Sequence, residues 1–370
     1  MPVSEGRRAV ADPGPDHRPA PDHRPAPDEE RRAARGVLHR TENGVSWITL
    51  DRPEVMNAVS REQRERIIAL LTDASADPAV RAVVITATGE GFCAGADLRG
   101  GRPEASASAD HTSGGHTSAD HTSASHTSAD HTSASHTSAS HTSADHTSAD
   151  HTSADHTSAS HTSADHTSAS HTSDASAAGG RERVPGDVAR MIRLGAQPFI
   201  AAVLDCEKPV IAAVNGTAAG IGAHLAFACD LVLASESARF IEVFVRRGLV
   251  PDGGGAYLLP RLVGPQRAKE LMFFGDALSA ADAERMGLVN RVVAADDLEK
   301  TARAWAERLA QGPTRALALT KHLVNASLDT DRASAFAAEA SAVEIAMTTR
   351  DANEGVASFV ERRTPEYRGR

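Results

Sequence analysis

The sequence predicts an α/β fold with a helical region at its C-terminal end. Apolar, β-branched runs bounded by glycine, proline or asparagine recur along the chain and are typical of buried strands. Helical patterns lie between these runs, which is the order expected for strand–helix–strand units of a parallel sheet. Beyond residue 296 helical periodicity continues with little strand character. These three observations indicate a sheet-and-helix core followed by helices.

The first strand–helix–strand unit begins with a strand over residues 44–50. Ser60 and Gln63 have the spacing of a capping box, which predicts that a helix starts there. One face of that helix would carry its apolar residues Ile67, Leu70, Leu71 and Ala74. A strand at 82–86 completes the unit, and later strands with helices beside them repeat the pattern. We therefore expect a sheet stacked in successive turns rather than closed as a barrel.

Composition separates the parts of the chain that can build a core from those that cannot. Residues 1–35 hold a tandem Pro-Asp-His-Arg-Pro-Ala unit and almost no large apolar side chain, so a disordered tail is expected. Residues 103–180 lack Lys, Arg, Val, Leu, Ile, Phe, Tyr and Trp, so a disordered insertion is expected as well. The insertion would interrupt a core over 36–296, and residues 297–370 would form the helical region.

A His-Thr-Ser repeat with a period of five fills the insertion from His111 to Ser173. This period fits neither a helix nor a strand. Its thirteen histidines are candidate ligands for zinc, copper or nickel. The alternative is an expanded tandem repeat without ligand geometry, and we expect no metal in the chemistry of the protein. Growth of a ten-residue loop to about seventy-five residues adds roughly 1.8 kcal/mol of closure entropy, which the fold should tolerate.

The charge pattern argues against several classes of function. Glu104 and eight aspartates give the insertion −9 of the formal net charge of −10, so the rest of the chain is close to neutral. A nucleic-acid-binding protein needs a basic face, which a neutral core does not predict. The sequence shows no apolar run of transmembrane length and no secretory signal. Three cysteines without disulfide or metal spacing fit a reducing compartment, so a cytoplasmic protein is expected.

Two glycine-rich segments, residues 91–98 and 215–224, are the strongest functional signal in the chain. Each follows a predicted strand. The second leads into an apolar helix whose first turn would present unpaired amides and the positive end of the helix dipole. Two such amide sources directed at one point would stabilise an oxyanion, such as that of an enolate or a tetrahedral intermediate.

These segments resemble those of the crotonase superfamily, also called the enoyl-CoA hydratase/isomerase family. The resemblance covers residues 36–102 and 181–370. It also rests on Asp51-Arg52-Pro53 with Asn57-Ala58, Lys208 to Gly216, Cys229-Asp230-Leu231, Gly248 to Gly255 and Ala283 to Val289. It implies a spiral of repeated ββα units and a C-terminal helical region that packs across the subunits of a homotrimer or a dimer of trimers.

The resemblance identifies two oxyanion donors, the backbone amides of Ala96 and Ile221. They would hold the carbonyl oxygen of a coenzyme A thioester while an enolate forms. Their side chains should matter little, because only main-chain N–H groups are used. The alternative is that both glycine-rich turns are only tight connections.

The acid and base groups depart from the hydratase pattern. Enoyl-CoA hydratases use two glutamates, and the matching positions here hold His224 and Phe244. Asp252 matches the aspartate of family members that isomerise dienoyl-CoA or attack an aryl thioester, so it is the expected base. Alternatively, Asp252 caps the helix after it. His224 is either a second proton carrier or a hydrogen-bonded structural residue, and Glu242 is a rival base without family support.

The turn around Asn57 and Ala58 resembles the family's contact with coenzyme A, which the backbone makes for the most part, and Ala94 belongs to the same predicted set. Lys321 matches a position near the coenzyme phosphates, or it is a solvated helix lysine. The sequence has no dinucleotide fingerprint, phosphate loop or Ser or Cys nucleophile elbow. Coenzyme A is therefore expected as part of the substrate, with no tightly bound cofactor.

The sequence thus predicts an acyl-CoA enzyme of the enoyl-CoA isomerase or hydratase type, in which Asp252 moves a proton and His224 assists. The alternatives are a hydrolase or decarboxylase of the same family and a non-catalytic protein that binds CoA esters or partner subunits. No nucleic acid and no membrane are expected as partners. The acyl chain cannot be predicted, because apolar residues of its pocket also serve as core.

Overall fold

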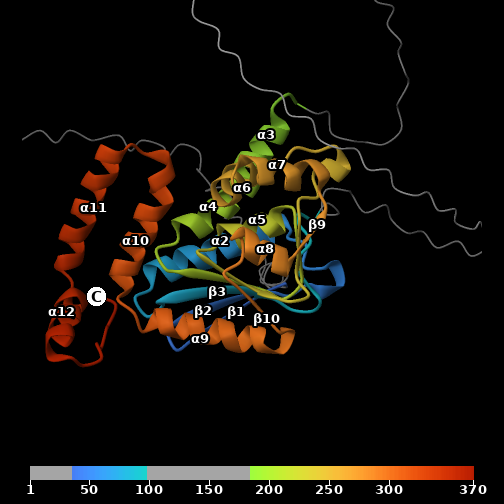
Figure 1. Ribbon diagram of the computed structural model, residues 1–370. Helices are drawn as coiled ribbons and strands as arrows, with labels where there is room; N and C mark the ends of the chain where they lie inside the picture. Colours follow the sequence, from blue (N-terminus) through green and yellow to red (C-terminus); the bar gives the residue numbers. More distant parts are fainter. Residues whose placement is uncertain (1–35, 98–183) are drawn as a thin grey trace, which may run out of the picture. The chain divides into compact units, whose positions relative to one another are not determined.

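Two sheets organise residues 36–97 and 184–370, the part of the chain that the computed structural model describes (Figure 1). The larger sheet contains, in spatial order, Val37–Glu42 (β1), Val45–Leu50 (β2), Ala82–Ala87 (β3), Val210–Val214 (β5), Leu231–Ser235 (β7) and Arg291–Val293 (β10). The smaller contains Gly91–Cys93 (β4), Thr217–Ala219 (β6), Arg239–Ile241 (β8) and Ala277–Ser279 (β9). The strands are parallel except at β1 and β9. The tail predicted for 1–35 and the insertion predicted for 103–180, with its histidines, lie outside the described residues.

Helices connect and cover these strands. They are Arg61–Ala76 (α2), Asp187–Met191 (α3), Gln197–Asp205 (α4), Ile221–Ala228 (α5), Gly255–Val263 (α6), Pro265–Phe274 (α7), Ala280–Met286 (α8), Leu298–Ala310 (α9), Thr314–Ala326 (α10), Arg332–Met347 (α11) and Arg350–Glu361 (α12). A π-helical turn, Ile192–Ala196, joins α3 to α4. None of the helices in the described part is long and apolar enough to cross a bilayer.

Successive strands alternate between the two sheets. β3, β5 and β7 join the larger sheet, and β4, β6 and β8, which follow them in sequence, join the smaller one. β6 leads directly into α5, and residues 242–254, which include the 3-10 helix Val245–Arg247, lead from β8 to α6. This repetition is the predicted spiral of ββα units, and it confirms the fold class.

The first predicted unit forms as expected. β2 pairs in parallel with β3, and α2 crosses between them. Ser60 and Gln63 satisfy each other's backbone N–H groups, so the capping box is complete. The four apolar residues assigned to one face of this helix are all buried. Local sequence signals therefore position the segment that precedes the first glycine-rich turn.

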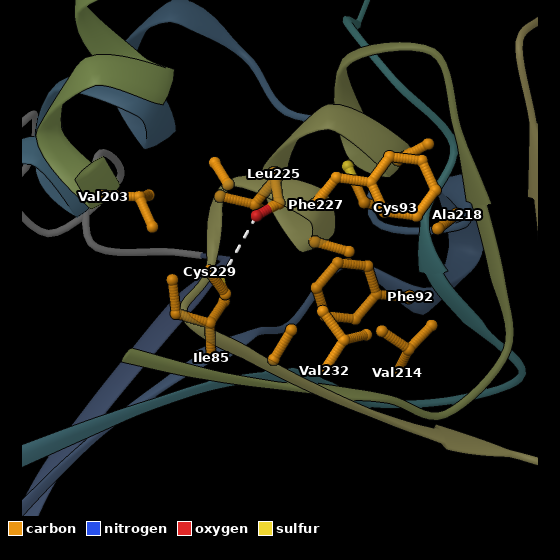
Figure 2. Packing of buried hydrophobic residues seen from close by; sticks show 14 of the residues in the cluster. Ile85, Phe92, Cys93, Val203, Val214, Ala218, Leu225, Phe227, Cys229 and Val232 are labelled. Carbon is orange, nitrogen blue, oxygen red and sulfur yellow. Dashed lines mark hydrogen bonds between the residues drawn. The ribbon is translucent and has the colours of Figure 1, made fainter. Parts of the chain in front are cut away.

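Each face of the larger sheet has its own apolar core. On one face, α9 covers a cluster that includes Trp47, Val84, Ile211 and Leu233. On the other face, α2, α4 and α5 pack over a larger cluster. Figure 2 shows side chains of that cluster, with Phe92, Val214 and Val232 stacked between sheet strands and α5. α9 thus packs as part of the core, although it belongs to the predicted C-terminal helical region.

The last three helices bury much less of their surface. α10, α11 and α12 confirm that the chain ends in a helical region. α11 contains one buried residue, Ala342. Large apolar side chains on these helices remain exposed, among them Val324, Phe336, Val343, Phe359 and Val360. This surface is unlike the nearly closed core of the sheets.

Candidate active site

The two glycine-rich segments lie side by side. β4 and β6 pair in parallel, with Gly91 opposite Thr217. Beyond the strands, a methyl group on Gly222 would lie 2.2 Å from the carbonyl oxygen of Cys93, so only glycine permits this approach of two backbones. Gly95 has a φ of +108°, and a methyl group there would lie 3.1 Å from the oxygen of Ala219. Both turns are therefore in main-chain contact.

The amides predicted to act as oxyanion donors lie next to this contact in the sequence. Ala96 comes after Gly95 and is exposed. Ile221 is the first residue of α5, where a helix leaves its N–H groups unpaired and carries partial positive charge. Within residues 36–97 and 184–370, neither amide donates a hydrogen bond. Two uncommitted N–H groups therefore extend from touching segments.

The turn that holds Asn57 is fastened to the first of these segments. The amide of Ala94 donates to the oxygen of Met56 at 2.9 Å, and the amide of Val59 donates to the oxygen of Gly95 at 2.8 Å. The buried Asn57 side chain donates to the oxygens of Thr88 and Gly91, both at 2.8 Å. The side chain of Asn57 is therefore used structurally, and the backbone around Ala58 and Ala94 lies next to Ala96.

Asp252 lies beside the second segment. A methyl group on Gly253 would lie 3.1 Å from the Ile221 side chain, which places the loop before α6 against the start of α5. The N-cap of α6 is Gly254, without a side-chain cap, so the alternative that Asp252 caps this helix is wrong. Burial raises the pKa of the Asp252 carboxyl, while the charges of His224 and Arg64 act in the opposite direction.

His224 and Glu242 meet inside the protein. His224 is fully buried on α5, and its Nε2 lies 3.0 Å from Oε2 of Glu242. The imidazole also stacks on Phe244, with ring centroids 5.4 Å apart. The sequence suggested His224 and Glu242 as separate candidates, whereas the structure joins them as a pair. Phe244 supplies an apolar wall on one face of the imidazole.

Within the described residues, the contacts of the Lys321 side chain do not involve Asp252, His224 or Glu242. Its Nζ lies 2.9 Å from Oδ2 of Asp230 and donates to the oxygens of Val203 and Lys208 at 2.9 and 3.3 Å. The side chain is 7 % exposed, so the interpretation of a solvated lysine is wrong. Its three protons are used inside the chain, where they anchor α10 to the core. The coenzyme contact stays a prediction.

The cysteines contribute no ready nucleophile. Cys93, Cys206 and Cys229 are all buried and free. Burial raises the pKa of Cys93 to about 11 and raises that of Cys229 as well. These two thiols therefore stay protonated at neutral pH, in agreement with the lack of a nucleophile elbow.

Two arginines near the site were missed by sequence reasoning. Arg52 lies 3.0 Å from Oδ2 of Asp97 and donates to the oxygen of Ala58, so it links the Asn57 turn to the segment that holds Ala96. The motif around Arg52 was noticed, but its partner could not be predicted without the fold. Arg64 follows the Ser60 cap by one helical turn, and that spacing could have directed it towards the site.

Comparisons with known proteins give one family for this chain. A family model described as enoyl-CoA hydratase/isomerase matches residues 40–126 and 178–370. A probable enoyl-CoA hydratase of Rhodobacter capsulatus is 31 % identical over 90 % of this chain and 98 % of its own length. The 1,2-epoxyphenylacetyl-CoA isomerase of Escherichia coli is 28 % identical over the same shares. The crystal structure of a putative enoyl-CoA hydratase from Streptomyces coelicolor superposes with a TM-score of 0.66 and 30 % identity, covering 95 % of this chain and 98 % of that one.

Proposed function

Because the chain belongs to the enoyl-CoA hydratase/isomerase family, we propose that it moves a proton within the acyl group of an enoyl-CoA ester and so shifts a double bond. The protein is an enzyme of this family, and its relatives are named for hydratase and isomerase reactions of CoA esters. An acyl-CoA substrate fits all of these names. The finer assignment depends on the site residues.

The observation that carries the proposal is the main-chain contact between the two glycine-rich segments. The contact supports the proposal because the uncommitted amides of Ala96 and Ile221 each lie next in sequence to a glycine or turn that takes part in it. The thioester carbonyl oxygen would accept from both amides as negative charge develops on it. Preorganised donors of this kind contribute several kcal/mol of transition-state stabilisation, and removal of one costs about 2.7–4 kcal/mol.

Asp252 would be the base. A double bond moves when a base removes a proton from one carbon, the electrons pass to the thioester oxygen, and the proton returns at another carbon. Asp252 is half-buried and directly precedes Gly253, which lies against Ile221, and its carboxylate forms no hydrogen bond with another described residue. Its raised pKa brings it closer to the pH at which a base works best.

The site residues favour isomerisation over hydration by the route that uses two glutamates. That route needs two carboxylates on one water, and the matching positions hold a buried histidine and Phe244. The relative in Escherichia coli that is named an isomerase acts on an epoxide, so it shows only that an isomerase of a CoA ester occurs among the relatives. His224 would assist as a second proton carrier.

The coenzyme would lie along the turn that precedes α2. The backbone around Asn57, Ala58 and Ala94 borders the proposed oxyanion site, as a contact with the pantetheine arm requires. Lys321 was the predicted contact for the phosphates. Its ammonium group already has three acceptors, so a contact with the phosphates would have to replace one of them.

Further copies of this chain would cover the exposed apolar surface of α10, α11 and α12. Phe359 is 84 % exposed and Val360 is 74 % exposed, and an apolar surface of this kind is typical of an interface. A homotrimer or a dimer of trimers, as the family resemblance implies, would bury it. The molar mass in solution, measured by light scattering, tests this part.

Incubation with CoA esters in deuterated water tests the proposed reaction. The protein is mixed separately with 2-enoyl-, 3-enoyl- and dienoyl-CoA, and the products are identified by mass. Deuterium incorporation with a shifted double bond and without added water supports the isomerase. A hydroxyacyl product would show a hydratase, free coenzyme A would show a hydrolase, and loss of carbon dioxide from a carboxylated ester would show a decarboxylase. No change in any ester would favour a non-catalytic binding protein.

A further inference from the structure

Arg64 on α2 is a half-buried cation. Its Nε donates to the backbone oxygen of Ser60 at 3.3 Å, which fixes the direction of the guanidinium group. Its terminal nitrogens, Nη1 and Nη2, form no hydrogen bond or ion pair with any residue that the structure describes. Because arginine keeps its charge in proteins, these nitrogens form a rigid fork of charged N–H donors that is unused.

The other half-buried arginines of residues 36–97 and 184–370 all use their terminal nitrogens. Arg52 and Arg303 form ion pairs with carboxylates. Arg81 donates from both terminal nitrogens to backbone oxygens near the C-terminal end of the chain. Removal of a charged group from water is unfavourable unless a partner compensates for it. Arg64 is the exception in this group, and its free fork indicates that a ligand supplies the partner.

The fork lies against the π-helical turn Ile192–Ala196. A methyl group on Gly195 would lie 3.6 Å from Nη1 and 4.0 Å from Nη2 of Arg64. α2 also packs against this turn and against α4, which continues from it. Short π-helical turns are rare and occur frequently at functional sites. The guanidinium group is therefore held beside the start of α4.

The turn and α4 connect this position to the proposed base. Ile200 follows Gly195 by roughly 7.5 Å along a helix axis. A methyl group on Gly253 would lie 3.6 Å from the Ile200 side chain, and Asp252 directly precedes that glycine. The charge of Arg64 also acts to lower the pKa of Asp252, an influence that weakens with distance. Arg64 and Asp252 thus lie towards opposite ends of one short helical stretch.

The stretch between these two groups is suited to hydrocarbon rather than to charge. No ionisable side chain lies between Gly195 and Ile200 in the sequence. Ala196, Phe199 and Ile200 are buried and belong to the apolar core. Arg193 in the same turn is exposed. The arrangement fits an acyl group with an apolar middle part and a negative charge at the end that is far from the thioester.

We propose that Arg64 is a specificity-determining residue and that the substrate is the CoA ester of a dicarboxylic acid. The thioester oxygen would accept from the amides of Ala96 and Ile221, and the carboxylate at the other end of the acyl group would accept two N–H bonds from Arg64. A planar carboxylate matches the fork of an arginine in this way. The inference deepens the proposed function and rests on it, because it assigns the acyl group of the same site.

Paired substrates test this assignment in the full-length enzyme. 3-Enoyl-CoA esters whose acyl group ends in a carboxylate are compared with esters of equal length that end in a methyl group, over a series of lengths. At the length that spans the site, kcat/KM should be about tenfold or more higher for the carboxylate-ended ester, since a hydrogen bond to a charged group contributes about 1.5–3 kcal/mol. Arg64→Gln should remove this preference and leave kcat/KM for the methyl-ended ester within about twofold.

Three further variants separate the fork from general effects of charge. Arg64→Lys keeps the charge but not the fork, so it should retain only part of the preference. Arg66→Gln on the same helix and Arg193→Gln in the adjoining turn make the same change of charge at exposed positions. Both should keep the full preference. A preference that falls equally in all of these glutamine variants would contradict a specific role of Arg64.

Calorimetry with saturated esters separates this inference from the proposed reaction. Saturated esters contain no double bond to move, so their Kd values test Arg64 whether or not the enzyme is an isomerase. The carboxylate-ended ester should bind about tenfold or more tightly than its methyl-ended partner, and Arg64→Gln should abolish the difference. Loss of turnover in Asp252→Asn judges the proposed function on its own.

Two results would overturn the inference. The first is an equal Kd for both kinds of ester at every length in the wild-type enzyme, a comparison that stays decisive if Arg64→Gln does not fold. The second is an equal loss of affinity for both kinds of ester in Arg64→Gln. That loss is expected if Arg64 contacts the coenzyme phosphates, which every ester carries.

Discussion

The start of α5 and the surface of α10, α11 and α12 differ in how completely one chain buries them. Every residue of α5 is buried, including His224. In α11 the buried residue is Ala342, and Phe359 of α12 is 84 % exposed. The proposed site therefore lies among buried residues, whereas much of the apolar surface of the C-terminal helices stays exposed in the single chain. Changes at the first region should affect turnover, and changes at the second should affect assembly.

The largest effect on turnover should come from Asp252→Asn. Asparagine keeps the shape of the side chain but cannot accept the proton, so kcat should fall by at least about 100-fold while acyl-CoA binding persists. Calorimetry measures binding and the deuterium assay measures turnover. Asp296→Asn, an exposed residue next to α9, provides the matched control. Retained turnover in Asp252→Asn would show that another residue is the base.

The pH profile of the wild-type enzyme gives a second test of Asp252. Burial raises the pKa of this carboxyl above its ordinary value of about 3.9. Because the base must be ionised, kcat/KM should fall as the pH drops through that raised value, and it should be restored as the pH rises. Activity that persists undiminished down to about pH 4 would disagree with a buried carboxylate as the base.

Gly222→Ala should have the next largest effect. The added methyl group would lie 2.2 Å from the oxygen of Cys93, so the two glycine-rich turns must separate. Displacement of one oxyanion donor should reduce kcat by about 100-fold or more. Gly355→Ala, where the nearest atom is the flexible hydroxyl of Tyr367, should retain activity. Normal turnover in a folded Gly222→Ala protein would show that the contact does not position the donors.

Phe359→Glu should act on assembly with a smaller effect on turnover. A charge placed at this exposed apolar position opposes burial against a second copy, so the molar mass in solution should decrease towards that of a single chain. Asn353→Glu adds the same charge at another exposed position of α12. If Phe359→Glu left the molar mass unchanged but abolished turnover, the assignment of assembly to the C-terminal helices would be contradicted.

Lys321→Met should change stability rather than kinetics. The substitution leaves Asp230, whose side chain is 22 % exposed, without its 2.9 Å partner. The free energy of unfolding should decrease by about 2–3 kcal/mol, a partial loss in line with the partial exposure of Asp230. The KM for the acyl-CoA should stay within about twofold of the wild-type value. A large rise in KM, with Lys300→Met unchanged, would instead support the predicted contact with the coenzyme phosphates.

The sequence predicted those parts of the fold that local signals determine. The capping box at Ser60 and the buried strand predicted at 82–86 follow from side-chain patterns over a few residues. Strands of three residues, such as β6 and β8, were missed because their length leaves too little periodicity to recognise. The predicted domain limits at 1–35 and 103–180 remain predictions, as does a cytoplasmic location.

The candidate site could be predicted one residue at a time but not as an arrangement. The sequence indicated His224, Glu242 and Asp252 individually. The contact between His224 and Glu242 depends on how two sheets stack, which no spacing along the chain encodes. The interpretation of Lys321 as a solvated lysine was wrong for the same reason. Its acceptors lie on three segments that are more than ninety residues away in the sequence.

The carbonyl stretching frequency of a bound CoA thioester tests the central claim most directly. An acyl-CoA labelled with ¹³C at the thioester carbon is bound to Asp252→Asn, which should not turn it over, and the infrared difference spectrum is recorded. If the amides of Ala96 and Ile221 donate to the carbonyl oxygen, the band should move to lower frequency than in water. That shift should be lost in the double variant with Gly222→Ala. A bound carbonyl with the frequency of the free ester would contradict the account.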